Sequence, residues 1–560
     1  MRWGGTRKGS GTFYTRPQLA IPTVHRTLRP LAYDPPAGDD GQPAVDAPAE
    51  KWTPKKPEEI LRLKVCDPAC GSGSFPLAAL RFLTGALYDS LVVHDRIRDH
   101  GGRAVLDLIY DEQSHETLAS EPLPCRPDDD DFEVRTKAIL RRYVIERCIY
   151  GVDLDPLAVE LCRLSLWIET LDRSLPLTFL KHKIKCGNSL VGAWFDQFLH
   201  YPAMAWEREG GDKNHTNGFH FHKEAWTKAI KEFKNRVKDD LIAFIDGGRF
   251  QSMYSVDMSM VQTGHDAAEA ALKEIHGFGI AQVDLRAARY EALLASDEFQ
   301  KLKAAFDLWC ALWFWPADQL DHAPLATQFA AGELDDEARE IAGDVANQQR
   351  FFHWELEFPD VFNAGSHGFD AVLGNPPWEV LQPNGEEFFS SLDPMYRGYG
   401  RLEKLQKQQQ LFSSCRTVEE SWLRYAAGFN AFANWVGCVA GPFGDHVRTD
   451  TNGKHLHDFN LGNRGSQSFQ TSTSRHEKWR VERGDSRGYS DIEHPFHHQT
   501  GRLFTYKLFL ECAHALLRDG GRMGFIVPSG LYSDSWSQPL RELFLDYCQW
   551  EWLFGFENRA

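Results

Sequence analysis

The sequence predicts an α/β fold in which a doubly wound parallel sheet carries large, mainly helical insertions. An apolar run at residues 61–66 leads into a glycine turn with Gly71 and Gly73, and apolar residues at helical spacing follow it. Strand, glycine turn and helix in this order open a doubly wound sheet. Short apolar runs then alternate with amphipathic helical stretches. This alternation favours one decorated sheet domain over several independent domains.

The elements are expected in the following order along the chain. A linker or long surface loop at 35–57, rich in Pro, Ala and Asp, precedes the first strand. Further strands are predicted at 148–152, 184–186, 369–373 and 523–527, and helices at 157–171 and 506–517, the second closed by Gly520 and Gly521. Residues 195–354 are mostly helical in pattern. Residues 379–500 begin helical and end in a polar loop from Gly441 onward.

Composition excludes several classes of protein. The 560 residues include 17 Trp and 37 Phe, with 42% apolar and 25% charged residues, so the chain can bury a large core and is not disordered throughout. It has no uninterrupted apolar run of about 18 residues and no basic-then-apolar leader. We therefore expect no membrane span and no secretory signal. Eleven scattered Cys without a C-x-x-C pair indicate reduced thiols, as in a cytoplasm, and neither a disulfide framework nor a zinc ribbon.

The charge distribution leaves nucleic-acid binding open. A net charge of −17 argues against a protein that coats nucleic acid. However, residues 1–33 contain six Lys or Arg and no acid, and residues 475–487 form a second basic stretch that acids dilute. Contact with phosphate is local, so such stretches can still bind DNA.

The glycine turn has the parts of a site for a nucleotide-like ligand. Gly71 and Gly73 let the backbone approach a ligand and offer amide donors at the start of a helix. Asp67, at the end of the strand, can accept hydrogen bonds from an ammonium or ribose group. The chain lacks the Gly-Lys-Ser/Thr of a phosphate-binding loop, and Phe75 and Pro76 stand where a dinucleotide fingerprint has its third glycine. These two alternatives therefore fail on their details.

A second acid, Asp153, closes the strand predicted at 148–152. In a Rossmann-like sheet such an acid lies beside the first turn and binds a ribose diol. Asp153 lies 86 residues after Asp67, against roughly 20 in the ordinary unit, so we expect an insertion between them, at about residues 89–132. The alternative is that Asp153 or Asp155 only caps the following helix.

The decisive motif is Asn375-Pro376-Pro377-Trp378, directly after the strand predicted at 369–373. The prolines remove backbone donors and stiffen the turn, so the Asn375 side-chain oxygen and the Pro376 carbonyl can face one point. Two acceptors without a competing donor suit a substrate amino group. Trp378 offers a surface on which a planar base can stack, worth on the order of 1–3 kcal/mol. The alternative is a surface turn, but surface turns rarely follow a buried strand and present a Trp.

In the order of these elements the chain resembles the gamma-class, adenine-specific DNA methyltransferases. These enzymes have a Rossmann-like sheet and depend on S-adenosylmethionine. Residues 11–17 are similar to the family's N-terminal motif that closes over the cofactor, and residues 67–73 to its methionine-binding motif. Residues 187–190 are similar to the motif that reaches the cofactor adenine, with Asn188 where relatives often carry Asp. Residues 525–529 match a later strand motif.

The resemblance implies the cofactor S-adenosylmethionine and a set of site residues. The catalytic residues would be Asn375, Pro376, Pro377 and Trp378. The cofactor-binding residues would be Tyr14, Thr15, Asp67, Pro68, Ala69, Cys70, Gly71, Gly73, Asp153, Leu154, Asn188 and Ser189. We expect no metal site, since the histidines at 455–498 lie in a polar loop and the acids at 128–131 are solvated and poorly spaced.

A closer resemblance concerns the large methyltransferases of type IIG restriction-modification and of the BREX and DISARM phage-defence systems. It rests on the Asn-Pro-Pro-Trp-Glu start, the long insertion after it and residues 552–559. Such relatives continue into further strands and a target-recognition domain, so we expect a fragment or a truncated gene product. The implied partners are double-stranded DNA with a flipped-out adenine, and other restriction or phage-defence subunits, with no membrane. The implied location is a prokaryotic cytoplasm.

The resemblance also implies a division of the chain. Residues 1–56 would form an N-terminal arm with the cofactor-closing motif and linker, and residues 57–194 the cofactor-binding half of the methyltransferase domain. Residues 195–354 would be a helical insertion, 355–390 the catalytic strand and motif, 391–500 a second insertion, and 501–560 the truncated later strands.

The expected reaction is methyl transfer from S-adenosylmethionine to N6 of adenine in DNA, as the modification activity of a restriction-modification or phage-defence system. One alternative is methylation of RNA or of protein glutamine, because the Asn-Pro-Pro-aromatic motif is shared. Another is a non-catalytic DNA-binding or partner-binding subunit of a defence complex.

Overall fold

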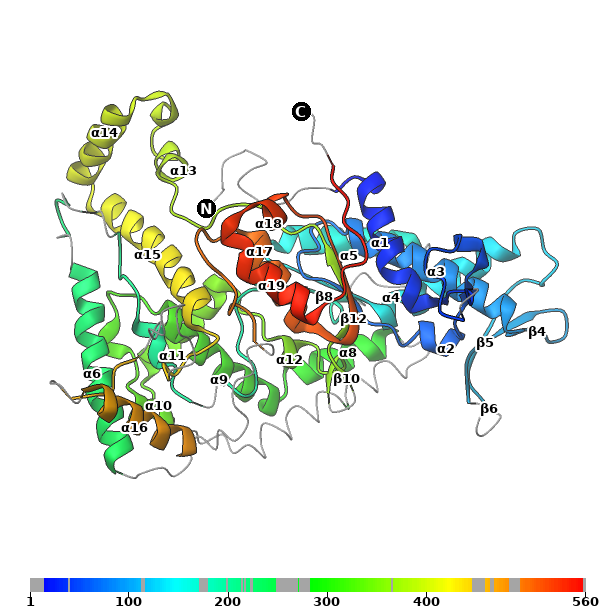
Figure 1. Ribbon diagram of the computed structural model, residues 1–560, viewed down its shortest axis with the longest axis horizontal. Coiled ribbons are helices and arrows are strands. Elements are labelled where there is room, and N and C mark those ends of the chain that lie inside the picture. Colours follow the sequence, from blue (N-terminus) through cyan, green and yellow to red (C-terminus); the bar gives the residue numbers. More distant parts are fainter. Residues whose placement is uncertain are drawn as a thin grey trace.

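A five-stranded parallel sheet lies at the centre of the computed structural model, in the order β12-β11-β3-β7-β8 (Figure 1). Its strands are β3 (Val65–Asp67), β7 (Ile149–Asp153), β8 (Ile184–Cys186), β11 (Phe369–Gly374) and β12 (Leu517–Phe525). The predicted α/β class is confirmed. The structure describes residues 15–38, 41–111, 116–170, 180–197, 200–212, 215, 218–221, 225–247, 270, 283–363, 366–445, 459–463, 468–482 and 494–556.

Helices cover both faces of the sheet. Successive strand residues point to opposite faces, and both faces carry apolar side chains that are buried under helices. Val65 and Ala371 belong to one core, and Cys66 and Val372, their chain neighbours, to the other. The first core is completed by α1 (Pro17–Ala32), α3 (Ser74–Val93), α4 (Phe132–Cys148) and α5 (Pro156–Thr170). The second is completed by α12 (Trp354–Glu357), α17 (Thr505–Leu516) and the helical insertions.

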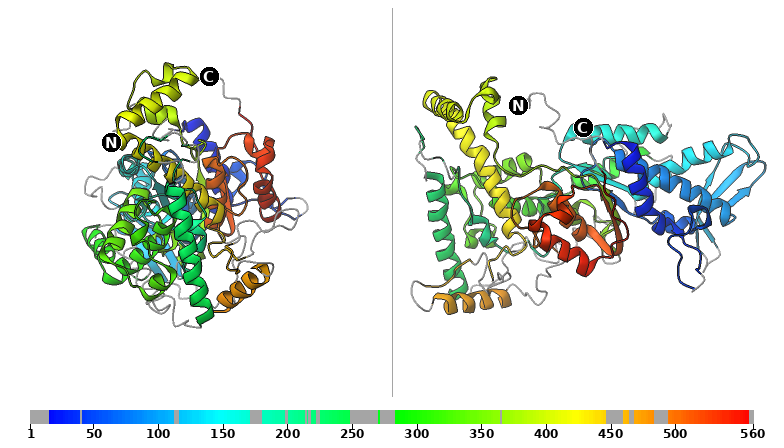
Figure 2. Two further views of the ribbon diagram at one scale, coloured as in Figure 1. Left: turned by 90° about the vertical axis from the view of Figure 1, so that its left-hand side faces the viewer. Right: turned by 45° about the horizontal axis from the view of Figure 1, so that its top comes forward.

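The two long stretches that interrupt the sheet share one core. Their described helices include α6 (Ala225–Gly247), α8 (Val283–Leu294), α9 (Asp297–Phe314), α10 (Ala326–Ala331), α11 (Asp336–Gln349) and α15 (Arg416–Cys438). Trp309 and Trp313 of α9 pack edge-on against Trp435 of α15, with ring centroids 6.1 and 5.5 Å apart. Beyond α15, α13 (Gly385–Ser390) and α14 (Arg401–Ser414) form a projecting arm (Figures 1 and 2).

A small antiparallel sheet lies where an insertion was expected between Asp67 and Asp153. It consists of β4 (Ile97–Asp99), β5 (Ala104–Asp111) and β6 (Glu116–Pro122), in that order. It extends from the end of the molecule away from the helical insertions (Figure 1). Helix α3 runs on to Val93, so the insertion begins later than residue 89.

Two strands start several residues away from the predicted position, while the other predicted strand boundaries agree to within two residues. Residues 61–64 do not belong to the strand: a turn at 61–62 follows α2 (Pro57–Ile60), Leu61 and Leu63 are buried, and β3 starts only at Val65. Strand β12 starts directly after α17, at Leu517. Its register against β11 shifts between the pairs Phe369–Leu517 and Ala371–Arg522, because residues around Gly520 (φ 72°) form a bulge.

The polar loop predicted from Gly441 onward contains a helix, α16 (Ser468–Glu482). Arg475 in the basic stretch pairs with Asp246 near the end of α6, at 2.8 Å, and Trp479 is fully buried. This part of the basic stretch therefore holds α16 against α6. One buried Trp in a polar segment gave too weak a periodic signal for a helix prediction.

Helix α3, with 20 residues, is long and apolar enough to cross a membrane by length and composition alone, with a mean hydropathy of 1.3 over an 18-residue stretch. However, 56% of this stretch is buried inside the protein, and α3 packs against α1, α4 and α5. It has the surroundings of a core helix.

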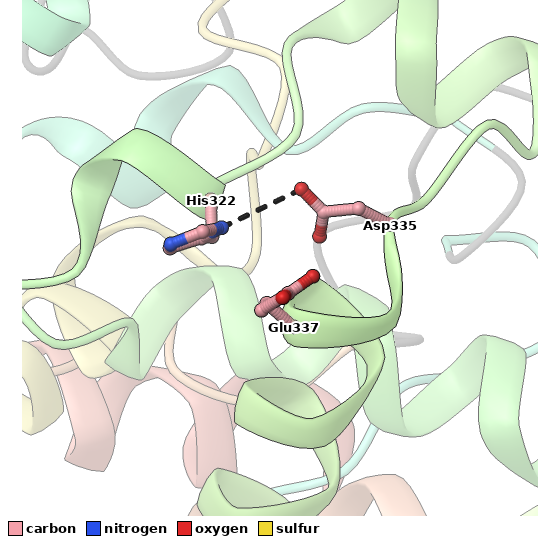
Figure 3. A group of neighbouring side chains, drawn as sticks. All are labelled: His322, Asp335 and Glu337. Atoms are coloured by element: carbon pink, nitrogen blue, oxygen red, sulfur yellow. Dashed lines mark hydrogen bonds and ion pairs between the residues drawn. The ribbon is translucent and has the colours of Figure 1, made fainter.

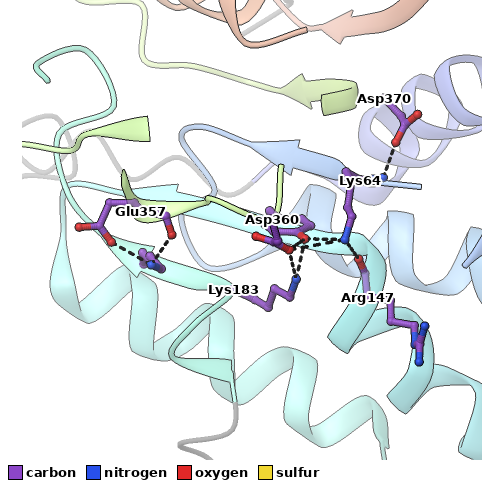
Figure 4. A network of polar contacts seen from close by, with 8 residues as sticks. Lys64, Arg147, Lys183, Glu357, Asp360 and Asp370 are labelled. Atoms are coloured by element: carbon purple, nitrogen blue, oxygen red, sulfur yellow. Dashed lines mark hydrogen bonds and ion pairs between the residues drawn. The ribbon is translucent and has the colours of Figure 1, made fainter. Parts of the chain in front are cut away.

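A buried polar network joins the amino ends of the strands (Figure 4). Tyr150 donates to the Asp360 carboxylate at 2.5 Å, and the ammonium groups of Lys183 and Lys64 lie 3.2 and 3.5 Å from the same oxygen. Burial lowers the pKa of Lys183 to about 7, against the attraction of Asp360. The network ties β3, β7 and β8 together at the edge opposite the sequence-predicted site residues.

Glu355 of α12 provides a test of how the core is packed. Burial raises the pKa of its carboxyl group to about 8, although Phe195 N–H donates to it at 2.6 Å. Unfolding therefore releases a proton between about pH 4.5 and 8, so the free energy of unfolding falls as pH rises through this window, by up to about 1.4 kcal/mol per unit. Glu355→Gln keeps an acceptor for Phe195 and should remove this fall in urea unfolding followed from pH 5 to 8. Glu340→Gln, at an exposed position of α11, is the control and should follow the wild type. Parallel curves for wild type and Glu355→Gln would contradict the account.

Candidate active site

Asp67 ends β3 at the carboxyl edge of the sheet. It is 2% exposed, and its Oδ1 accepts a hydrogen bond from Ala69 N–H at 3.0 Å. Gly374, the last residue of the neighbouring strand β11, lies against it: a Cβ at 374 would come 2.7 Å from Asp67 Oδ1. The turn after β3 and the loop after β11 therefore start side by side.

Asp153, the last residue of β7, holds the glycine turn. Its two carboxylate oxygens accept from Gly71 N–H at 2.8 Å and from Asp155 N–H at 2.9 Å. The turn needs glycine, since Gly71 and Gly73 have φ of 51° and 98°. A Cβ on Gly71 would meet nothing within 4 Å, so there is open space beside the turn. Asp155, not Asp153, accepts from Leu157 N–H in the first turn of α5, so helix capping accounts for Asp155 alone.

The loop after β8 closes on the same turn. Ser189 Oγ donates to Pro68 O at 2.6 Å, and Gly187 N–H donates to Asp153 O at 2.9 Å. Asn188 uses its side-chain oxygen locally, accepting from Leu190 N–H at 3.2 Å. The ends of β3, β7 and β8 thus form one connected rim.

Asn375 follows β11 with its side chain half engaged. Its Nδ2 donates to Thr15 Oγ1 at 3.1 Å. Its Oδ1 is buried and has no hydrogen-bond partner among the residues that the structure describes. A buried acceptor without a donor is costly, by about 1–3 kcal/mol, and native structures contain few of them. This oxygen is therefore a candidate contact for a ligand donor.

The rest of the motif continues from Asn375 as a stiff loop. Pro376 and Pro377 have no N–H, and the Trp378 side chain is 44% exposed. The loop is anchored at both ends: Ile526 N–H donates to Gly374 O at 3.1 Å, and Thr505 N–H donates to Glu379 O at 2.9 Å. A half-exposed Trp on an anchored loop is available to stack on a planar group.

Two buried acids make the site favourable for a cation, because burial disfavours a carboxylate that has no positive partner. Burial raises the pKa of Asp67, and the nearby charge of Asp153 raises it further. The hydrogen bond from Ala69 N–H acts in the opposite direction and lowers this pKa. Burial likewise raises the pKa of Asp153, against the N–H groups of Asp155 and Gly71. Within the described part of the chain, no Lys, Arg or His pairs with either carboxylate. A cationic ligand would relieve both groups.

The remaining predicted residues fall in different places. Cys70 turns its side chain into the core, against Cys162 and the bare Cα of Gly151, so only its backbone can meet a ligand. Leu154 is 51% exposed at the rim. Tyr14 and the rest of residues 11–14 lie outside the described residues, as do residues 557–559.

Sequence reasoning missed Arg350. This residue has a left-handed backbone (φ 55°), its carbonyl accepts from Asn188 N–H at 2.6 Å, and its guanidinium donates to Leu154 O. It therefore fastens the loops after β7 and β8 together. Arg350 comes from the helical insertion, about 160 residues further along the chain, and no local pattern marks it.

One surface cluster has metal-ligating atoms, but it does not resemble a built site. The ligand atoms of His322, Asp335 and Glu337 lie within 4.8 Å of one another, and all three residues are exposed (Figure 3). Asp335 caps α11 by accepting from Ala338 N–H at 2.6 Å, and His322 lies 3.5 Å from it. Helix capping accounts for the arrangement without an ion.

The contact of Asp67 with Gly374 makes a testable prediction. Gly374→Ala would force a methyl group against a buried carboxylate, so the free energy of unfolding should fall by about 1–3 kcal/mol. Gly428→Ala is the matched control: it lies within α15, where an added Cβ meets nothing within 4 Å, and should be neutral or stabilising by up to about 1 kcal/mol. Urea unfolding of both variants measures the difference, and equal effects would refute the close approach.

Comparisons with known proteins agree with this geometry. The family model of the Eco57I restriction-modification methylase matches residues 147–251 and 289–413, which include Asp153, Asn188 and Asn375. The putative type II restriction enzyme and methyltransferase RM.MjaORFECS2P of Methanocaldococcus jannaschii is 23% identical over 355 residues, 60% of this chain and 24% of that protein. The type II restriction enzyme and methyltransferase RM.Eco57I of Escherichia coli is 29% identical over 142 residues, 24% of this chain and 12% of that protein.

The matched part thus spans a quarter or less of the length of these relatives. No solved structure matches the chain significantly. The family model and both relatives are all described as methylases or methyltransferases of restriction-modification. The family match covers the strands that carry Asp153 and the Asn-Pro-Pro-Trp motif. Residues 147–251 and 289–413 are thus similar to the Eco57I restriction-modification methylases, and the chain is related, at low identity, to type II restriction-modification enzymes.

Proposed function

We propose that the chain transfers a methyl group from S-adenosylmethionine to N6 of adenine in DNA, as the modification activity of a restriction-modification or phage-defence system. The observation that carries the proposal is the buried Oδ1 of Asn375, which has no hydrogen-bond partner in the described ranges and lies one residue beyond the contact of Gly374 with Asp67.

The charges of the rim and the open space beside Gly71 support binding of the cofactor. S-adenosylmethionine carries a sulfonium and an ammonium group, and Asp67 and Asp153 are buried carboxylates without a cationic partner among the described residues. Asp67 would hold the methionine part, Asp153 the ribose, and the open space beside Gly71 leaves room for the backbone to approach. The resemblance implies that Asn188 and Ser189, in the loop after β8, would lie next to the cofactor adenine. When bound, the cofactor supplies an electrophilic methyl group on a good leaving group.

The residues of this chain would act on the amine. Asn375 Oδ1 and the Pro376 carbonyl would accept hydrogen bonds from the adenine amino group, which draws the nitrogen lone pair out of conjugation. The same acceptors stabilise the positive charge that develops on nitrogen, an electrostatic effect that is strong in a buried site. The anchored loop also fixes the amine in position, which contributes several kcal/mol in well-oriented reactions.

Trp378 would compensate for extrusion of the base. An adenine in a duplex must leave the stack to reach such a pocket, at a cost of a few kcal/mol. Stacking on an aromatic side chain returns about 1–3 kcal/mol. The half-exposed position of Trp378 beside Asn375 suits this role.

The family and the names of the relatives favour DNA over the alternatives. Both relatives are named restriction enzymes and methyltransferases, so we place the chain in the prokaryotic cytoplasm with DNA as its partner. Methylation of RNA or protein glutamine uses the same acceptor pair and is tested by the choice of substrate. A non-catalytic subunit would have no use for an acceptor kept free of donors.

Asn375→Ala separates catalysis from binding. It should lower methyl transfer to DNA about 10²- to 10³-fold and leave the Kd for S-adenosylhomocysteine unchanged, because the two acids that would hold the cofactor remain. Transfer is measured with methyl-labelled S-adenosylmethionine and unmethylated duplex DNA, and the Kd by calorimetry.

The control is Asn384→Ala, the same change nine residues further along the chain. Asn384 only caps α13, accepting from Glu386 and Glu387 N–H. It should leave transfer within about threefold of wild type, at a stability cost of about 1 kcal/mol. Undiminished transfer by Asn375→Ala would contradict the proposed role, and binding without transfer in wild type would favour the non-catalytic reading.

A further inference from the structure

The amide of Asn375 has a hydrogen-bond partner 360 residues away in the chain. Thr15 Oγ1 accepts from its Nδ2 at 3.1 Å, and Thr15 is only 6% exposed. The resemblance assigns Thr15 to the cofactor, but this contact reaches the catalytic side chain. The hydrogen bond therefore links the start of the described chain to the loop after β11.

In this contact the Thr15 hydroxyl accepts, and the amide is held with its oxygen toward the site. A hydroxyl can also donate, so it is a donor on the substrate side that makes this orientation the favourable one. An amide offers an acceptor oxygen at one end and two N–H donors at the other, and a half-turn of the group exchanges them. With Nδ2 held by Thr15, Oδ1 is left buried and unpartnered within the described part of the chain. The reverse orientation would point donors at a substrate amine, itself a donor, and would remove the acceptor that the reaction needs.

Thr15 is itself held by the sheet. It lies two residues before α1, which packs against β11 and β12. Thr27, on the same helix, fills the space over Gly524 of β12, where any Cβ would overlap its side chain. Because this close packing locks α1 to the strand beside β11, Thr15 and Asn375 keep a fixed relation.

We propose that Thr15 is a positioning residue for methyl transfer, which orients the Asn375 amide so that its oxygen faces the reacting amine. This inference rests on the proposed function. It predicts an effect on turnover rather than on the affinity for either substrate, because Thr15 acts through Asn375.

The test compares Thr15→Val, Thr15→Ser and Thr27→Val. Val keeps the shape of Thr15 and removes the acceptor, whereas Ser keeps the acceptor. Thr27→Val is the matched control: Thr27 is equally buried at 6% exposure on α1, and Val keeps the shape that fills the space over Gly524. Among the described residues, the hydroxyl that it removes donates to the backbone O of Thr23. The measurements are kcat and KM for methyl transfer to DNA, the Kd for S-adenosylhomocysteine by calorimetry, and urea unfolding.

We expect Thr15→Val to lower kcat about 10- to 100-fold, with KM for DNA and the cofactor Kd unchanged. Thr15→Ser should restore kcat to within about threefold of wild type, and Thr27→Val should not lower it further than that. If the wild type transfers methyl groups and Thr15→Val does so with the same kcat, the positioning role of Thr15 is overturned, while the proposed function stands. A weaker cofactor Kd in Thr15→Val, with kcat restored at saturating cofactor, would also overturn it and make Thr15 a cofactor residue. Cofactor binding without any transfer by wild type would instead overturn the proposed function itself.

Discussion

The contact between the Asp67 carboxylate and the bare Cα of Gly374 is the constraint on which the rest of the site depends. Strands β3 and β11 are neighbours in the sheet, and the carboxylate occupies the place that a side chain at 374 would take. The acid that we propose for the cofactor and the loop that we propose for catalysis therefore start side by side. A larger residue at 374 would separate the two halves of the chemistry.

Everything else at the carboxyl edge holds this contact in place. Asp153 ties the glycine turn to β7, Ser189 ties it to the loop after β8, and Arg350 joins the outer loops. At the opposite edge, Asp360 gathers Lys64, Lys183 and Tyr150 into a buried network that spans three strands. One end of the sheet is thus fixed by paired charges, while the other keeps, among the described residues, two acids without a cationic partner and one acceptor without a donor. That asymmetry is the physical signature of a binding site.

Much of this arrangement was predictable from local patterns. Each site acid or amide closes a short apolar run, and the carboxyl ends of parallel strands meet at one edge. The sequence therefore placed Asp153 beside the turn that follows Asp67, the resemblance grouped both acids with Asn375, and the strand at Ile184–Cys186 was predicted at its exact bounds.

The unpredicted parts depend on long-range packing. Arg350 and the Thr15–Asn375 bond join segments about 160 and 360 residues apart, so no window of sequence contains both partners. Helix α16 was not predicted because few of its side chains are buried. The bulge in β12 was not predicted because only the pairing with β11 shows that the strand already starts at Leu517. The free state of Asn375 Oδ1 is likewise a property of the folded site, not of the motif.

The central claim is that this edge of the sheet methylates an exocyclic amine of DNA. The most direct test incubates the chain with methyl-labelled S-adenosylmethionine and unmethylated duplex DNA, digests the product to nucleosides and identifies the labelled one. The account predicts label in N6-methyldeoxyadenosine alone. Label in 5-methyldeoxycytidine, or in no nucleoside while the same sample binds the cofactor, would contradict it.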